Sequence, residues 1–102
     1  MGLTIALQTA RGENAGVVHD PRNLLHRLLP PFEDKTFECL RYVDWYGDTV
    51  FNRLQMDSFL GDWQRIENNA NSSEESEILQ RVRDLATRCK EEPHLYLRFI
   101  GD

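Results

Sequence analysis

The sequence predicts a single α+β domain over residues 1–102, in which helices cover one face of a β-sheet. Two observations predict this class. Segments in which apolar residues alternate with polar ones, typical of strands, occur at the start, in the middle and at the end of the chain. Segments with apolar residues three and four apart, typical of helices, lie between them. We expect four to five strands, in an antiparallel or mixed sheet, packed against about three helices.

The N-terminal part predicts two strands and a helix. Residues 3–8 alternate between apolar and polar side chains and predict a strand. A turn-rich connector at 11–16 leads to a short return strand at 17–19. Residues 20–29 predict a helix, because Asp20 suits an N-cap and the leucines of this segment fall on one helical face.

The central segment, residues 37–55, predicts a β-hairpin. Residues 37–44 and 49–55 both alternate and are rich in residues that favour strands. Between them, Gly47 permits the backbone of a tight turn, and Asp48 can bond to nearby backbone groups. Neither face of the second arm is cleanly apolar, which indicates that its polar groups bind something specific or that the chain leaves the sheet early.

The C-terminal part predicts two more helices and a last strand. Apolar residues within 57–68 share one helical face. A longer helix is expected over 72–90, because Ser72 and Glu75 match a capping box and carboxylates cluster in its first turn. Residues 95–100 alternate again and predict the final strand, which begins after a proline that ends the helix.

Composition narrows the function classes. The formal net charge is −5, and no basic face is visible that could bind nucleic acid. No apolar run approaches the roughly 20 residues of a transmembrane helix. The first residues lack the pattern of a signal peptide, so we expect a cytoplasmic location and no membrane association. An acidic domain suits a basic protein partner, although the charge also simply favours solubility.

The two cysteines, Cys39 and Cys89, are too few and too far apart for a disulfide framework or a zinc site. We expect both to be buried free thiols. The pattern predicts no metal site and no cofactor.

An enzyme would need to combine scattered residues. The available groups are the imidazoles of His19, His26 and His94 and the carboxylates of Asp44 and Asp48. No pair of them has the helical spacing of a metal site, and no nucleophile motif is present. We therefore assign no catalytic residue and hold a small enzyme that uses these groups as the less favoured alternative.

The central run mixes aromatic and polar side chains more densely than any other part of the chain. Aromatic side chains at a turn tip are suited to anchoring a protein partner, and carboxylates are suited to polar contacts. The predicted protein-binding residues are Asp44, Trp45, Tyr46, Asp48 and Asn52. Asn52 and Gln55 also have a structural interpretation, in which they satisfy backbone groups of the hairpin.

The same run carries a family resemblance. Residues 44–52 read DWYGDTVFN and are followed by Gln55, and the chain ends in FIGD. The run and the ending resemble those of a family of small bacterial proteins whose function is not established. The resemblance covers roughly the last two-thirds of the chain and implies a bacterial, intracellular protein. It supplies no catalytic residue.

The favoured function is therefore a non-enzymatic protein-binding domain. An immunity or inhibitor protein that blocks a basic toxin has this size and charge, and electrostatic steering would give such a pair fast association. The alternative is a self-associating structural or accessory protein, a homodimer in which an edge strand such as the C-terminal one pairs across a two-fold axis.

Overall fold

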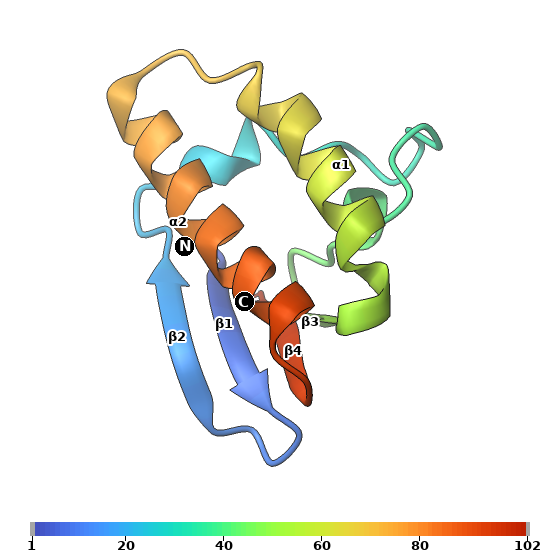
Figure 1. Cartoon of the computed structure of the whole chain (residues 1–102). Coiled ribbons are helices and arrows are strands. Elements are labelled where there is room, and N and C mark those ends of the chain that lie inside the picture. Colours follow the sequence, from blue (N-terminus) through green and yellow to red (C-terminus); the bar gives the residue numbers. More distant parts are fainter. Residues whose placement is uncertain (1, 102) are drawn as a thin grey trace.

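The computed structural model describes residues 2–101 and confirms the α+β class. Two α-helices pack on one face of a four-stranded antiparallel sheet, as Figure 1 shows. Two helices are present where about three were expected. The strands are β1 (Thr4–Thr9), β2 (Asn14–His19), β3 (Asp48–Asn52) and β4 (Leu95–Ile100), and the helices are α1 (Met56–Glu67) and α2 (Ser73–Glu91).

The strand order is β2-β1-β4-β3, and every neighbouring pair is antiparallel. The C-terminal strand β4 therefore lies inside the sheet, between β1 and β3. This position contradicts the expectation that β4 is an edge strand, because both of its sides are already paired. The two edges of the sheet are β2 and β3.

The core lies between the sheet and the helices. In β4 every second residue is buried, as its alternating pattern predicts, and Ile5 and Leu7 of β1 and Phe51 of β3 are buried too. An aromatic cluster fills the centre, where ring centroids of Phe51, Phe59, Trp63 and Phe99 lie 5.4–6.3 Å apart. The buried Trp63 indole donates a hydrogen bond to the Leu79 carbonyl at 2.9 Å, so its polar group has a partner inside the core.

The start of α2 follows the predicted capping pattern in part. The Ser72 hydroxyl accepts a hydrogen bond from the Glu75 amide at 3.1 Å. The Glu75 carboxylate is buried and accepts from the Arg27 guanidinium at 2.6 Å and from the Asn71 amide at 2.7 Å. These bonds, with Arg27 first, lower the pKa of Glu75 below its ordinary value. Through Arg27, Glu75 thus connects the start of α2 to the segment between β2 and β3.

The helix predicted over 20–29 is wrong. Only a short 3-10 turn, Leu24–His26, forms there, and Asn23 before it adopts a left-handed conformation with φ of 57°. The buried Asp20 carboxylate accepts hydrogen bonds from the amides of Leu24 and Leu25 at 2.8 and 2.9 Å. The capping interaction that Asp20 suggested therefore exists, but it closes a turn instead of starting a helix.

The first arm of the predicted hairpin, residues 37–44, is also wrong. This segment contains a 3-10 turn, Leu40–Tyr42, and no strand. The buried carboxylate of Asp62, on α1, accepts hydrogen bonds from the amides of Cys39 and Leu40 at 2.7 and 3.1 Å. Backbone groups that would pair in a hairpin are thus bound to a side chain of the helix.

None of the helices in residues 2–101 is both long and apolar enough to span a membrane.

Candidate functional site

The turn before β3 is held by its own polar side chains. The Asp44 carboxylate accepts a hydrogen bond from the Tyr46 amide at 2.9 Å. The Asp44 amide donates to the Thr49 hydroxyl, also at 2.9 Å. Asp44, predicted as a polar contact for a partner, is exposed but serves first to shape the turn.

The turn also packs against the end of β4. The Gly101 amide donates to the Gly47 carbonyl at 2.8 Å. A β-carbon at Gly101 would lie 2.4 Å from the Trp45 carbonyl oxygen, so only glycine fits at this position. The two motifs that carried the family resemblance, the central run and the chain ending, are therefore neighbours in the sheet.

Asp48 belongs to a network on the sheet face that the helices leave uncovered. Its carboxylate accepts from the Arg98 guanidinium at 3.0 Å, and the same guanidinium donates to the Gln8 side chain at 2.8 Å. This network links three strands, β3, β4 and β1. Asp48 therefore stabilises the sheet edge, although about half of its side chain remains exposed.

Asn52 and Gln55 form a reciprocal cap where the chain leaves β3. The Asn52 side chain accepts from the amides of Leu54 and Gln55 at 2.9 and 3.2 Å. The Gln55 side chain in turn accepts from the Asn52 amide at 2.8 Å. The pair satisfies backbone groups at the start of the short 3-10 turn Arg53–Gln55, which leads directly into α1.

The two predicted aromatic anchors differ in exposure. Trp45 is half-buried against the core, and its ring lies 5.4 Å from that of His26. Tyr46 at the turn tip is 86% exposed. Of the two, Tyr46 is the one that can contact a partner without a change in the core.

All five exposed large apolar side chains of the described residues lie within residues 32–54, a segment that also contains buried core residues. We call the side chains of this segment that are not buried the exposed patch. Part of this patch is preorganised. The Phe32 and Tyr42 rings meet edge to face at 5.8 Å, and the Arg41 guanidinium stacks over both, 4.2 and 4.8 Å from their centroids. The exposed apolar members of the patch are Phe32, Tyr42, Tyr46, Val50 and Leu54.

Within residues 32–54 acidic side chains outnumber basic ones, although Arg98 pairs with Asp48 and Arg65 bonds to Thr36 from outside this segment. Its residues include five carboxylates and three cationic side chains. Phe32, Tyr42, Val50 and Leu54 are absent from the predicted binding residues. Tyr42, Val50 and Leu54 lie in the two arms for which alternation predicted strands, so no local signal marked them as part of an exposed surface.

The candidate groups of the enzyme alternative are spread over the molecule. His94 has a left-handed φ of 68° and lies directly before the first residue of β4. Asp48 lies at the other end of β4, where it pairs with Ile100. His26 contacts Trp45, and His19 lies 3.3 Å from the Thr4 hydroxyl. Within residues 2–101, no three His, Cys, Asp or Glu side chains gather in a way that could hold a metal ion.

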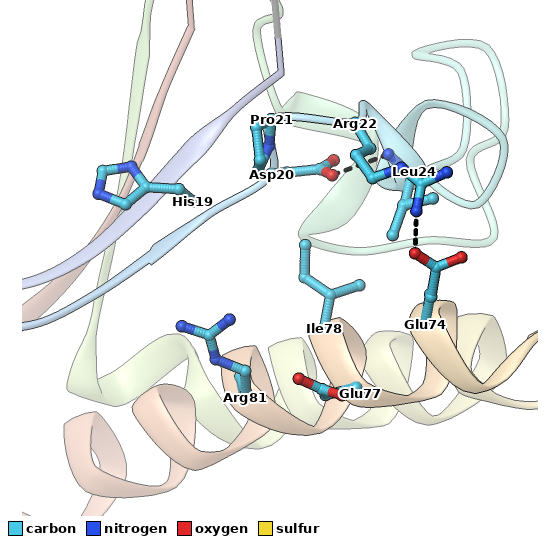
Figure 2. A pocket seen from close by; sticks show the side chains of 9 residues that line it. All are labelled: His19, Asp20, Pro21, Arg22, Leu24, Glu74, Glu77, Ile78 and Arg81. Carbon is cyan, nitrogen blue, oxygen red and sulfur yellow. Dashed lines mark hydrogen bonds and ion pairs between the residues drawn. The ribbon is translucent and has the colours of Figure 1, made fainter.

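An open hollow of about 220 Å³ lies between the end of β2 and α2 (Figure 2). Its lining contains three carboxylates and two guanidinium groups, and among these Arg22 pairs with Glu74. Figure 2 also shows Asp20 turned toward the backbone at Leu24 instead of into the hollow. The side chains of the hollow thus carry charges of both signs.

Both cysteines are buried and free, as expected. Burial, assisted by the nearby carboxylates of Asp62 and Glu38, raises the pKa of Cys39 to about 11. Burial also raises the pKa of Cys89. A thiol that stays protonated is a weaker nucleophile than a thiolate.

Comparisons of the chain with protein-family models, curated proteins and solved structures gave no significant match. The family resemblance noted in the sequence therefore stays a prediction.

Proposed function

We propose that the protein is a non-enzymatic protein-binding domain that holds a basic protein partner on the exposed patch, as inhibitor and immunity proteins do. One observation carries this proposal. The five large apolar side chains that are exposed in the described part of the chain all fall within residues 32–54. Exposed apolar side chains that are scattered singly need no explanation, whereas a concentration of them indicates a surface that a partner covers.

The chemistry of the patch suits a protein partner. Tyrosine and arginine are the residues most often found at energetic hot spots of interfaces, and Arg41 and Tyr42 already stack in a fixed arrangement. Such preorganisation lowers the entropy lost on binding. Tyr46, in contrast, is free to adopt the rotamer that a partner requires.

The charge of the patch suits a basic partner. Its five carboxylates outnumber its three cationic side chains, and the whole chain carries −5. Complementary charge increases the association rate and disfavours acidic partners. The association rate should therefore fall as the salt concentration rises.

The test is affinity capture from a lysate of the organism that produces the protein. Wild type is compared with Tyr42→Ala/Tyr46→Ala, both exposed positions, and with Arg81→Ala in the hollow of Figure 2 as a matched control. We expect one basic protein in stoichiometric amount with wild type and the control. The double variant should bind it at least about 30-fold more weakly, since truncation of hot-spot aromatics costs roughly 2 kcal/mol or more.

Circular dichroism and urea denaturation establish beforehand that all three proteins are folded. If the same protein binds the double variant as tightly as wild type, the patch is not the binding surface. A captured partner that is acidic would contradict the electrostatic part of the proposal.

A further inference from the structure

Strand β3 leaves one side of its backbone open. The bond from the Gly101 amide to the Gly47 carbonyl defines which pairs of the β3–β4 ladder are hydrogen-bonded. By the alternation of an antiparallel ladder, Thr49 and Phe51 bond to β4, whereas the N–H and C=O groups of Asp48 and Val50 point away from it. In the part of the chain that the structure describes, no further strand lies beyond β3.

One exposed apolar side chain lies on this strand, and two more lie in the turns before and after it. Tyr46, Val50 and Leu54 follow one another at intervals of four residues, with exposures of 86%, 44% and 81%. Val50 is the midpoint of this series and of β3 itself, which runs from Asp48 to Asn52. Two identical strands that pair in antiparallel orientation across a two-fold axis can be centred on such a midpoint residue.

We propose that a second copy of this chain pairs with β3 in antiparallel orientation, across a two-fold axis at Val50. In this register Val50 faces Val50, and Asp48 faces Asn52 of the second copy; the pairing stops there, because the chain enters a 3-10 turn at Arg53. The Val50 amides and carbonyls of the two copies bond to each other, and each Asp48 amide reaches the other copy's Asn52 carbonyl. The same residues act on both sides, as a two-fold interface requires.

The charges along this line are compatible, although each chain carries −5. Asp48 meets the neutral Asn52 and not a second Asp48. The Phe32–Arg41–Tyr42 stack takes no part in the register. The dimer would cover Val50 of the exposed patch and carry two such stacks, so the inference goes beyond the proposed function.

The other edge of the sheet is less suited to pairing. The Ala15 carbonyl of β2 accepts a hydrogen bond from the Arg88 guanidinium at 2.9 Å, so α2 already occupies part of that edge. The β1–β2 register also shifts between Leu7 and Gln8. Irregularities of this kind are a usual protection of an edge strand against pairing.

A symmetric disulfide provides the test. In hydrogen-bonded antiparallel pairs the Cα atoms are about 5.5 Å apart, a distance that a disulfide spans. Val50→Cys should therefore form a covalent dimer under mild oxidation. Val17→Cys, at the corresponding outward position of the β2 edge, is the matched control. The two native cysteines are buried and do not compete.

We expect Val50→Cys to cross-link at least about tenfold faster than Val17→Cys, because pairing raises the effective thiol concentration toward the mM range. Light scattering on wild type should show a mass that rises with concentration from 12.0 kDa toward twice that value. Val50→Lys should stay at 12.0 kDa, since the change places like charges opposite each other at the axis.

Equal cross-linking of the two cysteine variants would overturn the inference. So would a wild type that stays monomeric up to roughly 1 mM, where even a weak complex of about −4 kcal/mol is half formed. Capture of a basic protein by such a monomer would leave the proposed function standing, so the two failures are distinguishable.

Discussion

Two regions of the molecule satisfy their backbone hydrogen-bonding groups in different ways, residues 72–100 by regular secondary structure and residues 20–43 by buried side chains. In the first region, backbone groups pair within α2 and along β4, and Ser72 closes the start of the helix three residues away. In the second region, two buried carboxylates, Asp20 and Asp62, accept the amides of a segment that has only short 3-10 turns. The comparison teaches that a buried carboxylate can replace regular secondary structure when it satisfies the buried N–H groups.

Apolar burial does not distinguish the two regions. Leu25, Leu28, Leu29 and Leu40 of the irregular segment belong to the same core as the apolar face of α2. The regions differ in where the polar partners lie along the chain. Ser72 is a local partner, whereas Asp62 lies 22 residues from Leu40.

Asp62→Ala should have the largest effect on stability. The substitution leaves the buried amides of Cys39 and Leu40 without an acceptor, and each orphaned donor costs about 1–3 kcal/mol. We expect the free energy of unfolding in urea to fall by roughly 3–5 kcal/mol. Asp57→Ala, an exposed position on the same helix, is the control and should cost about 0.5 kcal/mol or less. A loss below about 1 kcal/mol for Asp62→Ala would break the comparison.

Asp20→Ala should have the second largest effect. Its carboxylate holds the amides of Leu24 and Leu25, and only the second of these bonds is fully buried. We expect a loss of about 2–3 kcal/mol in the same urea experiment. Asp20→Asn keeps one acceptor oxygen and should recover part of that loss. If the two variants are equally unstable, the negative charge matters more than the acceptor.

Ser72→Ala should cost about 1 kcal/mol, the usual value for a lost N-cap. The cap is exposed, so water can replace the hydroxyl at the Glu75 amide. Ser73→Ala, one residue inside the helix, is the matched control and should leave the urea midpoint almost unchanged. A larger effect for Ser72→Ala than for Asp62→Ala would reverse the order that the comparison predicts.

The smallest effect on stability near neutral pH comes from the Cys39 thiol. Cys39 belongs to the irregular segment and lies near the carboxylate of Asp62 on α1. Its pKa in the folded protein is about 11, above the ordinary 9.0, so the unfolded chain loses this proton first as the pH rises. The free energy of unfolding should therefore be unaffected below pH 9 and fall between pH 9 and 11, by at most about 1.4 kcal/mol per pH unit. Urea denaturation at pH 8 and 10.5, with Cys39→Ser as control, measures this slope. An identical slope in both proteins would contradict the prediction.

The sequence was sufficient where neighbouring residues decide the structure. Alternation predicted the strands over 3–8 and 95–100, and helical spacing with a cap predicted α2. It failed over 20–43, because Asp20 looks the same whether it starts a helix or closes a turn. The partnership of Asp62 with the amides of Cys39 and Leu40 has no local signature either.

The candidate site was predictable to a similar degree. Tyr46, predicted as an anchor from its place at a turn, is the most exposed large apolar side chain of the described residues. Trp45 has the same place in the sequence but packs toward His26, a contact that depends on the path of residues 20–43. The Phe32–Arg41–Tyr42 stack was not predicted, because no periodicity brings residues 32 and 41 together.

The interior position of β4 has a consequence for synthesis on the ribosome. Strands β1 and β3 are joined only through β4, and β4 is the last strand to be translated. A nascent chain that has emerged only as far as residue 94 can form the β1–β2 hairpin, which is marginally stable alone, while β3 has no neighbour. The apolar inner faces of the strands then stay open to chaperones and proteases. Folding of this domain is therefore a late event, and a product truncated before residue 95 would be left for the degradation machinery.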